Sequence, residues 1–164
     1  MDEKRITRVN YATIPVMKRV ISSAEEMLSF GAQLGAGLRG GETFVLTGDV
    51  GAGKTVITKG IAKGLAVDDD VQSPTFTISR VYEARDDLRL AHYDFYRLND
   101  AGIMRDELHE VLGDNKVVTI IEWADIVEDV VPEDAVSITI TPTSENVREL
   151  TIDYPGQVLE RNRV

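Results

Sequence analysis

The segment at residues 48–55, Gly-Asp-Val-Gly-Ala-Gly-Lys-Thr, has the residue types and spacing of a phosphate-binding loop. Glycines let backbone N–H groups turn inward, because no Cβ stands between them and a phosphate oxygen. Lys54 brings a positive charge to the β- and γ-phosphates, and the Thr55 hydroxyl is the expected Mg²⁺ ligand. A helix beginning at these two residues would direct its positive dipole end at the same oxygens. The complete G-x-x-x-x-G-K-[ST] pattern predicts a nucleotide site whose cofactor-binding residues are Gly48, Asp49, Val50, Gly51, Ala52, Gly53, Lys54 and Thr55.

The base of the nucleotide is predicted from a motif that the chain lacks. A guanine-specific site normally carries Asn-Lys-x-Asp, whereas Asn115-Lys116 is followed by two valines and leads straight into a strand-like run. We therefore expect ATP rather than GTP, together with Mg²⁺.

Two acidic residues, Asp94 and Glu122, each follow directly on a strand-like run. In open α/β sheets, ligand-binding groups lie beyond the carboxyl ends of the strands. One of these carboxylates would hold Mg²⁺ and the other would orient the attacking water, with the assignment left open. The catalytic candidates are thus Lys54, Asp94 and Glu122, and the metal candidates are Thr55, Asp94 and Glu122. The residues alone also permit either acid to be an exposed strand end.

Four further residues carry weaker signals. Thr75 follows a Ser-Pro pair and could sense the γ-phosphate as switch threonines do, although a solvated turn is the simpler interpretation. Trp123, the only tryptophan, is by itself better explained by core packing. His92 in a strand is more often structural than catalytic. Arg97 could stabilise transition-state charge or equally form a surface salt bridge.

The elements that must position these groups can be read from capping and hydrophobic periodicity. Ser23 and Glu26 form a capping-box pattern ahead of a helix, and the residues at 43–47 suit a buried parallel strand. The remaining expected elements are a helix from residue 54, a hairpin of 75–84 and 88–96, a helix at 100–112, a strand at 117–121 and a second hairpin of 136–140 and 150–154. This order predicts an α/β, P-loop NTPase-like fold: a mixed central sheet with a parallel core and antiparallel hairpins, flanked by helices.

Length and composition limit the organisation and the partners. A chain of 164 residues predicts a flexible basic N-terminal arm at 1–21, one P-loop ATPase domain at 22–157 and a C-terminal tail at 158–164. The 28 acidic and 18 basic side chains give a formal charge of −10, which repels nucleic acid at long range. Direct DNA binding is therefore not expected.

Two absences in the sequence exclude further classes of protein. The chain has no cysteine, which excludes a disulfide scaffold, thiolate catalysis and a cysteine zinc site. It has no run of eighteen apolar residues and no apolar stretch near its N-terminus typical of a secretory signal. We expect no membrane association and a cytoplasmic location.

Three more motifs follow the loop in a fixed order and carry a family resemblance. They are Ser73-Pro74-Thr75-Phe76-Thr77, His92-Tyr93-Asp94-Phe95-Tyr96-Arg97-Leu98 and Ile121-Glu122-Trp123. Each is moderately specific, but the ordered set of four is highly specific. The chain resembles the TsaE (YjeE) family of bacterial ATPases over roughly residues 22–155.

The resemblance implies a role in forming threonylcarbamoyladenosine next to the anticodon of tRNA. A family member hydrolyses ATP, weakly alone and more rapidly with its partner, and sustains turnover of the TsaD–TsaB heterodimer. Contact with tRNA would be indirect, through that complex. The resemblance also implies that Thr75 belongs to a switch-like loop. Asp94 and Glu122 would be the acids of the Mg²⁺ and hydrolysis site, and Trp123 would share their motif.

Departures from the family pattern and two other functions stay open at this point. Position 56 is Val where the family often has a second threonine, and Ala124-Asp125 stands where a proline is common. The alternatives are a P-loop small-metabolite kinase, with Asp94 as base and Arg97 as a lid residue, and a binding module regulated by a nucleotide that it does not hydrolyse.

Overall fold

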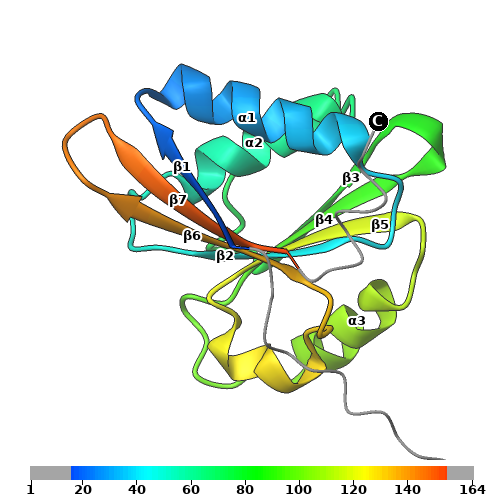
Figure 1. Cartoon of the computed structure of the whole chain (residues 1–164). Helices are drawn as coiled ribbons and strands as arrows, with labels where there is room; N and C mark the ends of the chain where they lie inside the picture. Colours follow the sequence, from blue (N-terminus) through cyan, green and yellow to red (C-terminus); the bar gives the residue numbers. More distant parts are fainter. Residues whose placement is uncertain (1–15, 155–164) are drawn as a thin grey trace, which may run out of the picture.

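The computed structural model describes residues 16–154, which form one mixed sheet with helices on both faces (Figure 1). In chain order the elements are β1 (Val16–Ile21), α1 (Ala24–Gly37), β2 (Thr43–Thr47), α2 (Lys54–Gly64), β3 (Ser79–Glu83), the 3₁₀ segment η1 (Arg85–Asp87), β4 (Arg89–Asp94), α3 (Ile103–Leu112), β5 (Val117–Glu122), the 3₁₀ segment η2 (Ala124–Val130), β6 (Val136–Pro142) and β7 (Arg148–Asp153). The seven strands lie in the order β1-β7-β6-β2-β5-β4-β3.

The centre of the sheet is parallel, as predicted. Strand β2 lies between β5 and β6 and runs parallel to both, and β4 runs parallel to β5. The antiparallel pairs are β3 with β4, and β7 with both β6 and β1. Every residue of β5 is buried, which fits its continuous apolar sequence. Since parallel strands end at one edge, β2, β4 and β5 deliver their last residues to the same place.

Helices α1 and α2 cover one face of the sheet, and α3 with η2 covers part of the other (Figure 1). Side chains of β4 and β5 alternate between these two layers. Leu90 and Ile120 pack in the cluster on the α1–α2 side, while Tyr93 and Ile121 pack with Leu108 of α3. The predicted apolar stripe of α2 is confirmed, because its members are fully buried: Ile57, Ile61 and Leu65.

Helix α1 is fixed at its start and along its length. The Ser23 hydroxyl accepts a hydrogen bond from the Glu26 N–H at 3.1 Å, and the Glu26 carboxylate accepts one from the Ser22 N–H at 2.8 Å, which confirms the predicted cap. Glycines then allow α1 and α2 to approach through their backbones. A Cβ at Gly60 of α2 would lie 2.4 Å from the Leu28 carbonyl oxygen and 2.8 Å from the Cα of Gly31. The two helices therefore pack as one layer.

The main correction concerns the proposed N-terminal arm at 1–21. Its last six residues form β1, which pairs in register with β7 from Val16↔Asp153 to Ile21↔Arg148. The sequence Val-Met-Lys-Arg-Val-Ile does not alternate between apolar and polar residues as a half-buried strand does. The reason is that β1 is an edge strand, and all but two of its residues are exposed. The rest of the arm and the predicted tail at 158–164 lie outside the described residues.

Smaller differences concern element boundaries. The first hairpin is confirmed, but its first strand begins at Ser79 rather than residue 75, because the residues at 75–78 form a turn closed by the Ile78 N–H on the Pro74 carbonyl. Helix α3 starts at Ile103 rather than residue 100, and η2 was not predicted. None of the helices within residues 16–154 combines the length and the apolar character that a membrane-spanning helix needs.

Candidate functional site

The loop at 48–53 connects the end of β2 to the start of α2, as the motif predicts. Helix α2 begins at Lys54, with Gly53 as its N-cap. Gly51 and Gly53 have φ angles of 82° and 118°, a region that strains residues with a Cβ. Glycine at these positions therefore gives the loop its curvature, and the amide dipoles of α2 face the loop.

Lys54 is folded into the loop that precedes it. Its ammonium group donates hydrogen bonds to the carbonyl oxygens of Gly48 and Asp49, the latter at 3.1 Å. The same Nζ lies 5.0 Å from the centre of the Trp123 ring, within the range of a cation–π contact. Only 7% of Lys54 is exposed. The positive charge of Lys54 is thus held between the phosphate loop and the residue that follows the end of β5.

Asp94 and Glu122 are direct neighbours across the sheet. They are the last residues of β4 and β5, they are register partners, and both are buried. The two oxygens of Asp94 are used differently: Oδ2 accepts from the Thr75 hydroxyl at 2.7 Å, and Oδ1 accepts from the Tyr96 N–H at 3.0 Å. Glu122 Oε1 is hydrogen-bonded to His92 Nε2 at 2.8 Å. The strands thus bring together two carboxylates far apart in the sequence.

Thr75 lies in this group of residues, although its signal in the sequence was weak. The segment after α2 returns to the sheet edge and places the hydroxyls of Ser73 and Thr75 2.8 Å apart. The Ser73 hydroxyl is also within 3.4 Å of Asp94 Oδ2. Ser73 belongs to the same sequence motif as Thr75, and its residue type and spacing predict no role of its own. The loop is therefore tied to β4 through Asp94.

Trp123 has a backbone conformation that few large residues adopt. It follows β5 with φ 56° and ψ 53°, in the left-handed region. This turn directs its ring toward Lys54 and toward Tyr96, whose ring centre is 4.8 Å away. Strain of this kind is typically retained at functional positions. Trp123 is half-buried and also packs against the core cluster that includes Tyr93 and Leu108, so core packing and contact with the site apply together.

Most of the predicted residues line one cavity of about 460 Å³. Its walls are the phosphate loop, the 73–76 segment, and the ends of β4 and β5. The lining includes these predicted residues: Val50, Gly51, Gly53, Lys54, Thr55, Thr75, Asp94, Glu122 and Trp123. Arg97 also lines it, with its guanidinium 4.4 Å from the Phe76 ring centre. Gly48 and Asp49 line another cavity of about 180 Å³, and Trp123 lines both cavities.

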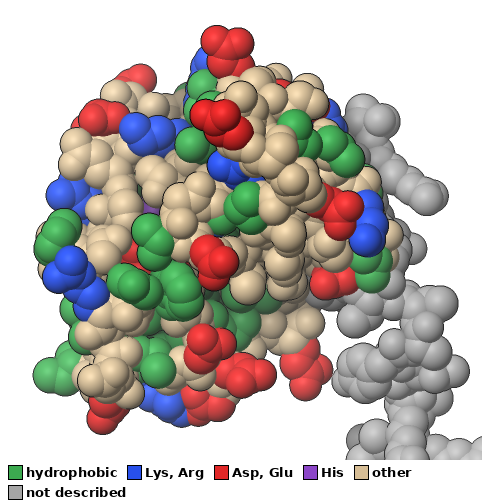
Figure 2. Space-filling model, turned by 90° about the vertical axis from the view of Figure 1, so that its left-hand side faces the viewer, with side chains coloured by type: hydrophobic (Ala, Val, Ile, Leu, Met, Phe, Trp, Pro, Cys, Tyr) green, Lys and Arg blue, Asp and Glu red, His purple; other side chains and the backbone are tan. Residues whose placement is uncertain are grey.

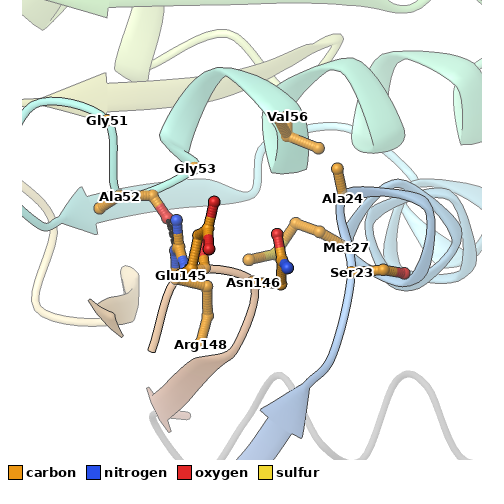
Figure 3. A pocket seen from close by; sticks show the side chains of 10 residues that line it. All are labelled: Ser23, Ala24, Met27, Gly51, Ala52, Gly53, Val56, Glu145, Asn146 and Arg148. Atoms are coloured by element: carbon orange, nitrogen blue, oxygen red, sulfur yellow. Dashed lines mark hydrogen bonds between the residues drawn. The ribbon is translucent and has the colours of Figure 1, made fainter. Parts of the chain in front are cut away.

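A further cavity of about 160 Å³ lies beside the phosphate loop (Figure 3). Gly51, Ala52 and Gly53 form one wall, the start of α1 forms another, and the turn between β6 and β7 closes it. Arg148 fixes that turn: its Nε donates to the Ala52 carbonyl at 3.0 Å, and its Nη1 donates to the Glu145 carbonyl at 3.0 Å. Sequence reasoning missed Arg148, because nothing local distinguishes it from a surface arginine of a hairpin.

Large apolar side chains surround the entrance to the main cavity. Val50 is 73% exposed, Phe76 81% and Tyr96 52%, and all three line the cavity. Figure 2 views the molecule from the side on which β2 and β6 end, and hydrophobic side chains gather on that face. Large apolar groups that surround a pocket and face solvent are typical of a surface that another molecule covers.

Known proteins share both the sequence and the fold. The model of the TsaE family, described as threonylcarbamoyl adenosine biosynthesis protein TsaE, matches residues 21–150. The tRNA threonylcarbamoyladenosine biosynthesis protein TsaE of Treponema pallidum is 35% identical over 136 residues, which cover 83% of this chain and 99% of that protein. The protein of the same name from Bacillus subtilis is 38% identical over 122 residues, which cover 73% and 74% of the two chains.

A solved structure agrees with these sequence matches. The crystal structure of YdiB from Bacillus subtilis superposes with a TM-score of 0.75 and 30% identity, and the match covers 91% of this chain and 93% of that one. Fold, order of motifs and family match therefore point the same way. This chain belongs to the TsaE family, whose members take part in the biosynthesis of threonylcarbamoyladenosine in tRNA.

Proposed function

We propose that this protein binds ATP with Mg²⁺ at the 48–55 loop and hydrolyses it to ADP and phosphate, and that it thereby sustains turnover of the TsaD–TsaB complex in tRNA modification. The observation that carries this proposal is the cavity of about 460 Å³ on which Lys54, Thr55, Asp94 and Glu122 converge. A phosphate-binding loop alone would bind the nucleotide without hydrolysing it. A cradle that faces two buried carboxylates also has the groups needed to hold a metal ion and a water.

The residues around the loop fit the proposed ligands. Backbone amides of the loop and of the start of α2 would bind phosphate oxygens. The ammonium group of Lys54 would leave the loop carbonyls and bind phosphate oxygens instead. Thr55 and the carboxylates supply hard oxygen ligands, which Mg²⁺ prefers. No group of three or more acidic, histidine or cysteine side chains within residues 16–154 could hold a metal by itself. This fits an ion that is bound mainly through phosphate.

The two acids would have different tasks in hydrolysis. Asp94 already accepts hydrogen bonds at both oxygens, so its first effect is to hold Thr75 at the cavity. Glu122 is anchored only through Oε1, and its other oxygen is hydrogen-bonded to no described residue. Glu122 would therefore accept a hydrogen bond from the attacking water and orient it. Bound Mg²⁺ would neutralise the charge that develops on the phosphates.

The cavity of about 160 Å³ beside the loop is the proposed place for the adenosine. It adjoins the cradle through Gly51 and Gly53, which line both cavities. Met27 and Val56 offer apolar surface to a ring, and the Asn146 amide can both donate and accept hydrogen bonds, as the adenine edge requires (Figure 3).

The proposed dependence on a partner rests on the rim of the main cavity. Val50, Phe76 and Tyr96 expose apolar area where the nucleotide would enter. A protein that covers this rim would exclude water and order the residues that line the cavity. A net charge of −10 makes the chain itself a poor ligand for tRNA, so contact with tRNA would pass through TsaD–TsaB.

The test measures ADP release by the protein alone, with TsaD–TsaB, and with TsaD–TsaB plus tRNA. We expect slow release alone and stimulation by the complex. Lys54→Ala should abolish release and leave the free protein folded, as checked by circular dichroism, because Lys54 contributes its charge to the cavity and lies outside the apolar core. Hydrolysis retained by Lys54→Ala, or phosphate transferred to a small metabolite in place of water, would contradict the proposal.

A further inference from the structure

His92 is a buried histidine in contact with one of the proposed catalytic acids. Its side chain is fully buried in β4, and its Nε2 lies 2.8 Å from Glu122 Oε1. Its other ring nitrogen, Nδ1, is buried and has no hydrogen-bond partner among the described residues. Imidazole does not contribute to the apolar core as a leucine would, and half of its hydrogen-bonding capacity goes unused. Packing alone therefore does not account for a histidine at this position.

The sheet places His92 in hydrogen-bond contact with Glu122 and with no other predicted site residue. His92 and Asp94 are two residues apart in β4, so their side chains lie on the same face. The register sets His92 opposite Ile120 and Asp94 opposite Glu122, so the bond to Glu122 runs diagonally between the strands. Both oxygens of Asp94 accept hydrogen bonds from other groups. His92 is thus the one described residue that is hydrogen-bonded to the Glu122 carboxylate.

The contact with Glu122 locates one proton of the His92 imidazole. An ionised carboxylate only accepts hydrogen bonds, so the proton in this contact belongs to Nε2. His92 therefore fixes the carboxylate of Glu122 through a hydrogen bond from Nε2.

We propose that His92 is a positioning residue for ATP hydrolysis: it holds Glu122 Oε1 so that the other carboxylate oxygen faces the bound nucleotide. This inference rests on the proposed function. A glutamate side chain has several rotatable bonds, and an unanchored one would leave the productive geometry most of the time. Groups that orient a catalytic or metal-binding side chain from behind typically change activity by about 10- to 100-fold.

The kinetic test compares two substitutions at position 92. His92→Leu removes the donor, whereas His92→Gln keeps an N–H donor near the position of Nε2. We expect His92→Leu to lower kcat for ATP hydrolysis in the presence of TsaD–TsaB by about 10- to 100-fold, with the ATP KM and ADP affinity changed by less than about threefold. His92→Gln should recover most of kcat. The matched control is His109→Gln, at an exposed position of α3, which should behave as wild type.

Two kinetic outcomes would overturn the inference. One is an active wild type together with a His92→Leu variant of equal kcat. The other is a parallel loss of kcat and nucleotide affinity in both variants, which would make His92 a structural residue. A wild type that releases no ADP under any condition would instead refute the proposed function itself, so the two failures are distinguishable.

A second readout does not depend on hydrolysis. The chain has only two histidines, so ¹⁵N spectra of the imidazole groups can be assigned with the His109→Gln variant. His92 should carry a proton on Nε2 that exchanges slowly with water. Glu122→Ala should shift this signal and accelerate the exchange. An Nδ1–H tautomer, or a signal that Glu122→Ala leaves unchanged, would show that the hydrogen bond does not exist in solution.

Discussion

Gly60→Ala is a sharp test of how α1 and α2 are packed. The new Cβ would lie 2.4 Å from the Leu28 carbonyl oxygen, about 1 Å closer than the 3.4 Å at which ordinary contact begins, and 2.8 Å from the Cα of Gly31. Both obstacles are backbone atoms of the neighbouring helix, so no side-chain rotation relieves the clash. The two helices must separate locally, and the core between them and the sheet must loosen.

The expected change in the free energy of unfolding for Gly60→Ala is the sum of two opposing contributions. Alanine favours the helical conformation of α2 by about 1 kcal/mol relative to glycine. Overpacking a close contact typically costs about 1–3 kcal/mol, and a backbone obstacle places this case at the upper end. We therefore expect a net loss of about 2 kcal/mol in the free energy of unfolding. For a chain of this size, that loss lowers Tm by roughly 4–8 °C.

The assay is thermal and urea unfolding followed by circular dichroism, with Gly113→Ala as the matched control. Gly113 is the C-cap of α3, has φ −81°, and would place a Cβ no closer than 3.5 Å to the nearest of its neighbours, the Glu110 carbonyl oxygen. The control should change stability by less than about 0.5 kcal/mol. A Gly60→Ala protein as stable as wild type, or more stable, would refute the close approach of the two helices.

Three more predictions concern the site and its surroundings. Glu122→Ala should lower ATP hydrolysis far more than nucleotide affinity, because its proposed role is in the transition state; equal losses of kcat and ADP affinity, by calorimetry, would make it a ground-state binding residue. Arg148→Ala removes the hydrogen bond to the Ala52 carbonyl, and should weaken ADP binding by about tenfold in the same titration; unchanged affinity would exclude Arg148 as a support of the loop. Burial, followed by the neighbouring Glu107, raises the pKa of Tyr93, so the neutral phenol stabilises the fold below its ordinary pKa of 10.0 and this stabilisation falls at higher pH. Urea unfolding at neutral and alkaline pH should show that loss in wild type and a smaller one in Tyr93→Phe; identical pH profiles would contradict it.

The local sequence was sufficient to predict a structural feature wherever that feature depends on one short segment of the chain. The 48–55 loop, the cap at Ser23 and the apolar run of β5 each depend on neighbours within a few residues, and each was predicted with the right structure. The convergence of Asp94 and Glu122 was also predictable, because both end strands of one parallel sheet.

The features that sequence could not supply depend on contacts between distant segments. Strand β1 was missed because its only partner in the sheet is β7, near the other end of the described chain. Arg148 supports the loop through Ala52, which lies 96 residues earlier in the chain. His92 looked structural because its partner, Glu122, is set by the register between β4 and β5. Contacts of this kind produce no hydrophobic periodicity or motif in either of the two segments that make them.

The position of β7 between β1 and β6 also sets an order of events on the ribosome. Strand β1 leaves the exit tunnel first among the described elements, yet its partner β7 leaves last. Until then β1 has an unpaired edge, and the Ala52 carbonyl lacks the Arg148 side chain that supports it. Since domains generally fold as units, the nucleotide site of a nascent chain is completed only after β7 has been synthesised. A truncated chain that ends before β7 would thus carry the whole phosphate-binding motif without its scaffold.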